Sequence, residues 1–169
     1  MVCCEAEIPS LQPSLPPGKP NASVCKATGS EISGRGVVLD SFALLAFLGD
    51  ETGAEEVAAL LEAADAERPV LMSYVNLGEV LYITERSRGP GAVDQVLGAV
   101  DQLPIDLVEA GRLQTIAAAR LKARFPLSYA DAMCAALGEL AGLPVITGDP
   151  EFRAVEGRIQ VLWLGEREG

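Results

Sequence analysis

The chain has 169 residues, of which 49% are hydrophobic and 22% charged, enough for one sizeable core in a single domain. Its formal net charge of −11 argues against a generic basic nucleic-acid-binding surface and favours a cationic ligand or a basic partner. The chain contains no histidine, which excludes Ser-His-Asp and Cys-His nucleophile systems, histidine bases and histidine-ligated zinc.

The four cysteines form no recognisable metal or disulfide pattern. Cys3, Cys4 and Cys25 lie in the N-terminal part, and Cys134 lies in the apolar run of a predicted helix, where we interpret it as a small core residue. No apolar run approaches the roughly 18 residues that span a bilayer, and the N-terminus has no signal-peptide pattern. We therefore expect a cytoplasmic protein in a reducing compartment, without a membrane partner.

Residues 1–35 differ in composition from the rest of the chain. They contain five prolines, and no apolar period of 2 or 3.6 residues runs through them. Two interpretations stay open: a disordered head that belongs to the protein, or a start placed too far upstream, with translation beginning near Val37. In both cases the predicted domain is residues 36–169.

Predicted strands and helices alternate through this domain. The predicted strands are residues 36–40, 69–72, 104–107, 143–147 and 159–164. The predicted helices are residues 41–48, 52–66, 73–88, 90–103, 108–124 and the segment that Ser128 caps and that ends near Gly142. Such alternation predicts right-handed crossovers and a parallel sheet covered on both faces, with ligands bound beyond the carboxyl ends of the strands.

Four acidic residues occupy positions that this fold would bring together. Asp40 ends the first strand, Asp131 lies in the first turn of the helix that Ser128 caps, and Asp149 follows a later strand. Glu79 lies in an apolar helix, on the same face as Asn76, where a glutamate is unusual unless it is paired or bound to metal. The aspartates also have local interpretations, as helix caps or as the start of an Asp-Pro turn, but a shared site explains all four at once.

The segments around these residues carry a resemblance to a known family. They read VLDS at residues 38–41, NLGE at 76–79, LSYADA at 127–132 and TGDPEF at 147–152. In this order and spacing they resemble PIN-domain ribonucleases, most of all the VapC-type toxins of bacterial toxin–antitoxin pairs. The resemblance covers roughly residues 37–164 and leaves the N-terminal head unmatched.

The resemblance implies a three-layer α/β/α sandwich with sheet order 3-2-1-4-5, and a metal-dependent endoribonuclease that forms a homodimer and is inhibited by a cognate antitoxin. By position it implies an acidic quartet of Asp40, Glu79, Asp131 and Asp149 as catalytic and metal-binding residues. Ser41 and Thr147 correspond to supporting hydroxyl groups. Asn76 is interpreted from its place on the helix as a capping or orienting residue.

The same chemistry follows from the residues alone. Like charges raise one another's pKa, so four crowded carboxylates cannot all stay ionised without a cation, and an oxygen-only cluster suits Mg²⁺ or Mn²⁺. A bound metal ion lowers the pKa of a water and neutralises a phosphate, which permits RNA hydrolysis without histidine. Arg86, Arg88, Lys122 and Arg124 are candidates for holding flanking phosphates, although each also suits a helix carboxyl end.

Other protein classes with acidic pockets fit less well. An aspartyl phosphatase needs a second aspartate two residues after Asp40, where Phe42 stands, and a receiver domain needs a lysine where Gly148 and Asp149 follow the strand. A catalytically inactive RNA-binding or dimerisation module of the same fold is the non-enzymatic alternative, and the intact quartet disfavours it.

Overall fold

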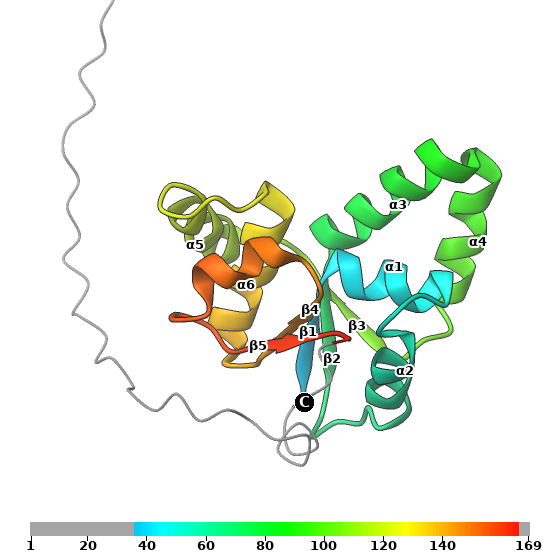
Figure 1. Cartoon of the computed structure of the whole chain (residues 1–169), viewed down its shortest axis with the longest axis horizontal. Coiled ribbons are helices and arrows are strands. Elements are labelled where there is room, and N and C mark those ends of the chain that lie inside the picture. The colour runs from blue at the N-terminus through cyan, green and yellow to red at the C-terminus, as the bar shows by residue number, and fades with distance from the viewer. Residues whose placement is uncertain (1–35, 166–169) are drawn as a thin grey trace, which may run out of the picture.

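A computed structural model describes residues 36–165 of the protein; the predicted head (residues 1–35) and residues 166–169 lie outside the described part. Five strands form one sheet, β1 (Val37–Leu39), β2 (Val70–Ser73), β3 (Ile105–Val108), β4 (Val145–Thr147) and β5 (Val161–Trp163). All neighbouring pairs are parallel, and the order is β3-β2-β1-β4-β5 (Figure 1). The predicted parallel sheet and its strand order are confirmed.

Six α-helices and one short 3-10 helix connect the strands. They are α1 (Ser41–Gly49), α2 (Ala54–Glu62), α3 (Tyr74–Arg88), α4 (Pro90–Val100), α5 (Arg112–Lys122), α6 (Tyr129–Ala141) and η2 (Pro150–Val155). Sequence patterns predicted every α-helix but missed η2. Three helices are shorter than predicted: α2 begins only after Gly53, whose backbone is left-handed (φ 98°), α5 begins after Gly111, and α4 ends at Val100 instead of residue 103.

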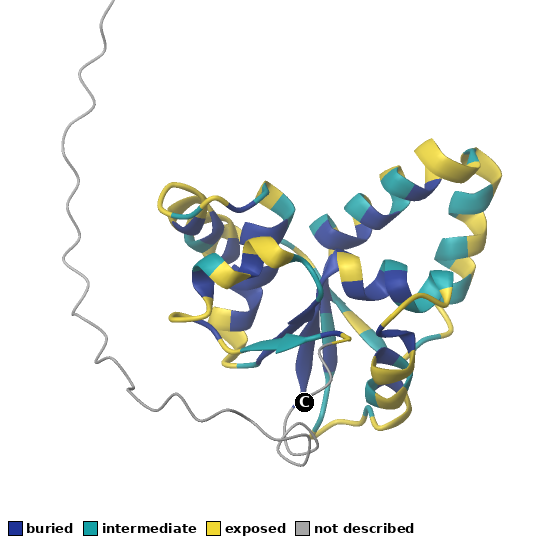
Figure 2. Cartoon of the chain, viewed as in Figure 1, coloured by how far each residue is buried: buried dark blue, intermediate teal, exposed yellow. Residues whose placement is uncertain are grey.

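The side chains of the strands alternate between two cores, one on each face of the sheet. Val37 and Leu39 pack with helices α1 to α4, whereas Val38 packs with α5, α6 and η2. The helices accordingly lie in two layers on either side of the strands, and the central strands are buried (Figure 2). This three-layer arrangement confirms the predicted fold class.

Three helix N-termini meet at the carboxyl edge of the sheet. Ser41 at the start of α1 donates from Oγ to the carbonyl of Asn76 in α3 at 3.2 Å. The Asn76 amide in turn donates to the carbonyl of Ala130 in α6 at 3.2 Å. Direct hydrogen bonds therefore hold the starts of α1, α3 and α6 together beside the ends of β1 and β4.

Polar side chains at the predicted boundaries cap these helices. Asp40 accepts from the backbone of Phe42, Ser73 from that of Val75, and Ser128 from that of Asp131. Each cap satisfies a backbone N–H that a helix start leaves without a partner.

None of the helices between residues 36 and 165 combines the length and the apolar character needed to cross a bilayer.

Candidate functional site

Asp40 lies at the centre of the carboxyl edge, between β1 and α1. Its side chain is 1% exposed and accepts hydrogen bonds from Thr147 Oγ1 to Oδ2 at 2.8 Å and from Asn76 Nδ2 to Oδ1 at 3.3 Å. Burial, followed by the charge of Asp131, raises the pKa of Asp40 to about 7, although the bond from Thr147 acts in the opposite direction. The structure thus holds a carboxyl group with a strongly perturbed pKa against two supporting residues.

Asn76 connects the site to the surrounding helices. It is fully buried, and its Nδ2 donates to Asp40, to Ser41 Oγ at 3.1 Å and to the Ala130 carbonyl. Its Oδ1 has no hydrogen-bond partner among the described residues, although it is buried. A buried amide oxygen without a donor lowers the stability of the folded state, so this position of Asn76 costs unfolding free energy while it orients Asp40. The expected orienting role fits these contacts.

Asp131 occupies the first turn of α6 in a capping box. The Ser128 N–H donates to Asp131 Oδ2 at 3.1 Å, and the Asp131 N–H donates to Ser128 Oγ at 3.0 Å. Burial raises the pKa of Asp131 to about 6; the hydrogen bonds from Ser128 lower it, whereas Glu151 and the charge of Asp149 raise it further. Asp131 is therefore both a helix cap and a near neighbour of other carboxyl groups.

Glu151 joins the site, although sequence reasoning did not select it. Its Oε2 accepts from the Ser128 N–H at 2.8 Å, the same N–H that donates to Asp131 Oδ2, so the two carboxyl groups lie close together and Glu151 contributes to the raised pKa of Asp131. The run Asp149-Pro150-Glu151 starts η2, and this places Glu151 in the first turn of that helix. Glu151 belongs to the TGDPEF segment that the sequence analysis singled out. The short 3-10 helix that places Glu151 next to Ser128, however, has no clear sequence pattern.

The other two predicted site residues, Asp149 and Glu79, are both half-buried. Asp149 is half-buried; its N–H donates to Thr147 Oγ1 at 3.0 Å, and its Oδ1 accepts from the Glu151 N–H at 2.8 Å. Glu79 is half-buried on α3, so it is less enclosed than a core glutamate would be. Its charge, together with those of Asp40 and Asp131, raises the pKa of the buried Cys134 thiol, as does burial itself, the largest cause.

Electrostatic interactions connect the four predicted carboxylates to one another or to a shared neighbour. Asp131 acts on Asp40, Asp149 acts on Asp131, and Glu79 acts on the same thiol as Asp40 and Asp131. The local caps considered from sequence are also present at Asp40, Asp131 and Asp149. Within residues 36–165, however, no three Asp, Glu, Cys or His side chains stand close enough to form a ready-made metal cage.

The donor set nevertheless fits a hard divalent cation. All four side chains offer carboxylate oxygens, and Mg²⁺ commonly binds through one or two carboxylates while it keeps several waters. Burial, and after it the neighbouring carboxylates, disfavours the charged forms of Asp40 and Asp131 and raises their pKa values, and a bound cation would favour the charged forms again. A closed cage of three ligands is not required for such an ion.

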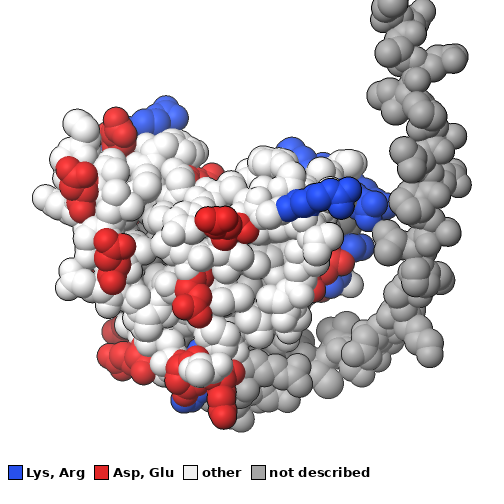
Figure 3. Space-filling model, turned by 180° about the vertical axis from the view of Figure 1, so that it is seen from behind, with Lys and Arg blue, Asp and Glu red and all other residues white. Residues whose placement is uncertain are grey.

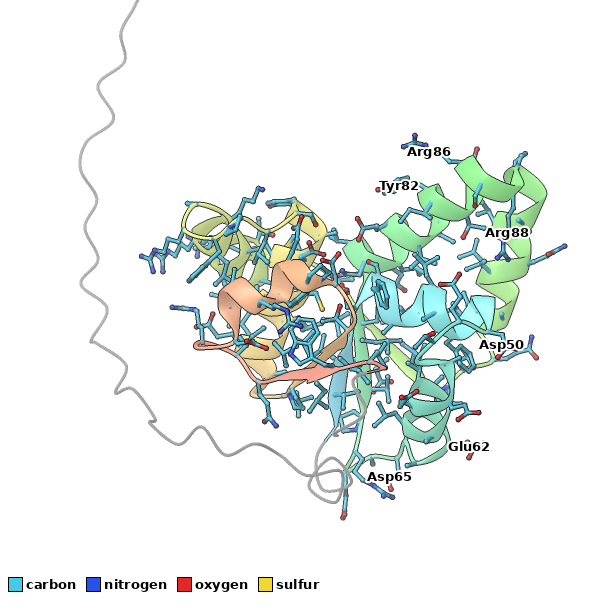
Figure 4. The ribbon with its side chains drawn as sticks, in the orientation of Figure 1. Asp50, Glu62, Asp65, Tyr82, Arg86 and Arg88 are labelled. Carbon is cyan, nitrogen blue, oxygen red and sulfur yellow. The ribbon has the colours of Figure 1, made fainter. Side chains whose placement is uncertain are left out.

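The predicted phosphate-binding side chains are dispersed. Arg86 and Arg88 lie in the last turn of α3, far along the helix from Asn76 (Figure 4). Lys122 donates to the Leu127 carbonyl and so closes the loop between α5 and α6. Arg124 is exposed in that loop. Two shallow depressions, one beside Gly142 and Pro144 and one beside Pro69 and Pro104, lie at the opposite edge of the sheet from the carboxylates.

The architecture defines the class: an α/β protein with an acidic site at the carboxyl edge of a five-stranded parallel sheet. The sequence profile of the PIN domain matches residues 37–158. The chain belongs to the PIN domain family. No curated protein sequence matches it significantly.

Solved structures share the fold at low sequence identity. VapBC2 from Rickettsia felis, bound to a DNA fragment from its promoter, has 11% identity and a TM-score of 0.60, covering 76% of this chain and 98% of that one. DNA-bound VapBC from Salmonella typhimurium has 20% identity and a TM-score of 0.59, with 76% and 97% covered. Mycobacterium tuberculosis VapC20, a toxin that cleaves the sarcin-ricin loop, has 20% identity and a TM-score of 0.56, with 70% and 94% covered.

Proposed function

We propose that the protein is a metal-dependent endoribonuclease and the toxin of a toxin–antitoxin pair, with Asp40, Glu79, Asp131 and Asp149 as the catalytic and metal-binding residues. One observation carries this proposal: Asp40 and Asp131, which lie 91 positions apart in the chain, are buried close enough for the charge of one to raise the pKa of the other. Folding gains nothing from this repulsion, so a cation that relieves it is the simplest explanation.

The residues of the chain have distinct tasks in the proposed reaction. Thr147 and Asn76 hold the two oxygens of Asp40, which fixes the direction of its carboxylate. The half-buried carboxylates of Glu79 and Asp149 remain open to solvent, where substrate enters. A bound Mg²⁺ or Mn²⁺ would neutralise the quartet, lower the pKa of a water and orient the scissile phosphate. Glu151, which accepts from the same Ser128 N–H as Asp131, adds a fifth carboxyl group beside this set.

The proposed partners are an RNA substrate, a cognate antitoxin and a second copy of the chain, all in the cytoplasm. The related VapBC structures are toxin–antitoxin pairs bound to DNA, which supports an antitoxin as partner. The net charge of −11 favours an antitoxin segment that is basic or apolar and docks over the acidic carboxyl edge.

A cleavage assay tests the nuclease proposal. We expect the protein to cut a structured RNA in the presence of Mg²⁺ or Mn²⁺ and to lose at least about a hundredfold in rate in the Asp40→Asn and Asp149→Asn variants, because each removes a ligand from the cation. Asp94→Asn, an exposed change on α4, is the matched control and should cleave at the wild-type rate. Equal turnover by Asp40→Asn would refute the assignment, and RNA binding without any cleavage would favour an inactive module.

Co-expression tests the antitoxin. The product of an adjacent small gene is expected to co-purify with the protein and to suppress cleavage. A gene that stands alone, or a neighbour whose product leaves the rate unchanged, would contradict this part of the proposal.

A further inference from the structure

Trp163 lies in the edge strand β5, and its indole ring contacts the short helix η2. It is the only tryptophan of the chain. Its Nε1 donates to Glu156 Oε1 at 2.6 Å, and the guanidinium carbon of Arg153 lies 4.8 Å from the centre of its ring. Arg153 belongs to η2, and Glu156 is the carboxyl-terminal cap of that helix. One side chain of the sheet edge therefore holds the last turn of η2 in two ways, by a hydrogen bond and by a cation–π contact.

The other end of η2 is part of the candidate site. Asp149 caps the first turn and accepts from the Glu151 N–H, and the Phe152 N–H donates to the Asp149 carbonyl at 3.2 Å. A 3-10 helix of six residues has poor hydrogen-bond geometry of its own, so its direction depends on the side chains that anchor it. A shift of the last turn would therefore also move Asp149 and Glu151.

The backbone of β5 is joined to the start of the same segment. Trp163 is the register partner of Thr147 in the parallel sheet, and the Leu164 N–H donates to the Thr147 carbonyl at 3.0 Å. Thr147 in turn donates from Oγ1 to Asp40. We call residues 147–156 the acidic segment. The end of β5 thus holds this segment at its start through the backbone and at its end through the Trp163 side chain.

Apolar packing alone does not account for Trp163. It packs on the face of the sheet that α6 and η2 cover, together with Val161 and the fully buried Phe152, but it is itself only half-buried. A leucine or a phenylalanine would cover the same apolar surface. The indole adds what these side chains lack: an N–H donor for Glu156 and the aromatic face that binds a guanidinium best.

Basic side chains are unevenly distributed over the protein. On the face seen from behind they gather toward one side, whereas acidic side chains are spread over the rest (Figure 3). Residues 125–157 contain five acidic residues and only one basic residue, Arg153, so its replacement changes the local charge as well as the contact with Trp163. Arg158 offers a control of equal charge, because it pairs with Glu139 of α6 and not with the indole ring.

We propose that Trp163 is a positioning residue for the acidic segment: it holds Arg153 and Glu156, and thereby fixes the places of Asp149 and Glu151 in the site. This inference rests on the proposed function and adds a residue to it. Trp163 acts through η2 and not on the reacting groups. A looser η2 would let two carboxylates turn away from the site, which weakens the binding of a divalent cation even where the rest of the fold is intact.

Amide hydrogen exchange in the metal-free protein tests the anchor directly. We expect Trp163→Leu to accelerate exchange at three amides of the acidic segment by at least about fivefold, because local opening becomes easier there. These are the amides of Asp149, Glu151 and Phe152, whose hydrogen bonds lie within the segment. Leu162→Ala changes the neighbouring residue of β5, which packs on the opposite face of the sheet. It should lower stability but leave these three amides at the wild-type rate.

Calorimetric titration with Mn²⁺ measures the effect on the site without RNA. Trp163→Leu and Arg153→Gln should each raise the Kd for Mn²⁺ by about 2- to 10-fold, the range that a cation–π contact supplies. The double variant should bind Mn²⁺ no more weakly than Trp163→Leu alone, because both changes remove the same contact. Glu156→Gln can still accept from the indole and should keep the wild-type Kd, as should Arg158→Gln.

Arg153→Gln carries both measurements if Trp163→Leu does not fold, because Arg153 is exposed. Wild-type exchange rates in the Trp163 and Arg153 variants, an equal acceleration in Leu162→Ala, or an unchanged Kd for Mn²⁺ would overturn the positioning role. An equal rise of Kd in Arg158→Gln would overturn it too, because the effect would then be one of charge.

The proposed function fails by a different result. A wild-type protein that binds no Mn²⁺ and cleaves no RNA would remove the nuclease, and the exchange rates of the three amides would still decide whether Trp163 holds the acidic segment.

Discussion

The carboxylate of Asp40 is buried beside Asp131, and its hydrogen-bond donors are neutral: the Thr147 hydroxyl, the Asn76 amide and the Phe42 backbone N–H. Neutral donors orient the group without supplying the positive charge that would favour its ionised form. The pKa of about 7 reflects this balance. A carboxyl group whose pKa is raised by burial and by a second acid nearby is typical of a functional site rather than of a structural ion pair.

The metal-free protein should lose stability as pH rises. The folded state holds the Asp40 proton up to about pH 7, whereas the unfolded chain releases it near 3.8, so the unfolding free energy falls across this window. Asp40→Asn removes the effect and should be more stable than the parent by up to about 4 kcal/mol at pH 8, with little difference at pH 4. Urea denaturation at both pH values, with a chelator present, measures this. A difference that is the same at both values would contradict the prediction.

Asn76 should matter for activity beyond its contribution to stability. Asn76→Ala removes the donor to Asp40 and to the Ala130 carbonyl, which should cost about 1–3 kcal/mol and lower the cleavage rate at least tenfold. Gln114→Ala is the matched control, because its buried amide donates to the Met133 carbonyl at 3.0 Å within the α5–α6 core. It should lose similar stability but keep the wild-type rate per folded molecule. Equal rate losses in Asn76→Ala and Gln114→Ala would show that Asn76 affects the rate only through stability.

At the scale of elements, the site is an assembly of helix starts rather than a pocket inside one element. The starts of α1, α3 and α6 are joined by Ser41 and Asn76, and the β4–η2 loop brings Asp149 and Glu151 to them. The close approach of this loop to α1 depends on Gly148, which has no side chain to separate them.

Gly148→Ala tests this contact. The new methyl group would collide with the Phe42 ring, and we expect a loss of about 1–3 kcal/mol in unfolding free energy. Combining it with Phe42→Leu should recover part of the loss in a double-mutant cycle. Gly98→Ala in α4 is the contrast: nothing lies within 4 Å of its added Cβ, so it should gain about 0.5–1 kcal/mol. Additive effects of Gly148→Ala and Phe42→Leu would contradict the contact.

The whole molecule carries a net charge of −11 and concentrates several carboxylates at one edge of its sheet. Its folded state should therefore respond to divalent cations more than to ionic strength. A ligand that binds only the folded protein raises its stability by RT ln(1 + [L]/Kd), about 2.7 kcal/mol at a hundred times Kd.

Mg²⁺ or Mn²⁺ should raise the melting temperature, and the rise should be larger at pH 8 than at pH 5, because protons on Asp40 and Asp131 compete with the cation. Differential scanning fluorimetry measures the shift, with NaCl at matched ionic strength as control. Asp40→Asn and Asp149→Asn should lose most of it, whereas Asp94→Asn should not. An equal rise in melting temperature with NaCl would show that the divalent cations act only by screening charge.

The sequence by itself determined the alternation of strands and helices, the caps Ser73 and Ser128, and the placement of Asp40, Asp131 and Asp149 at strand ends or helix starts, because these depend on local periodicity and backbone geometry. The strand order followed from a family resemblance, not from periodicity. Glu151 as a neighbour of Asp131, and Asn76 as the residue that joins the starts of three helices, became visible only in the tertiary structure. Contacts between residues dozens of positions apart depend on how the helices pack, and no local pattern encodes that packing.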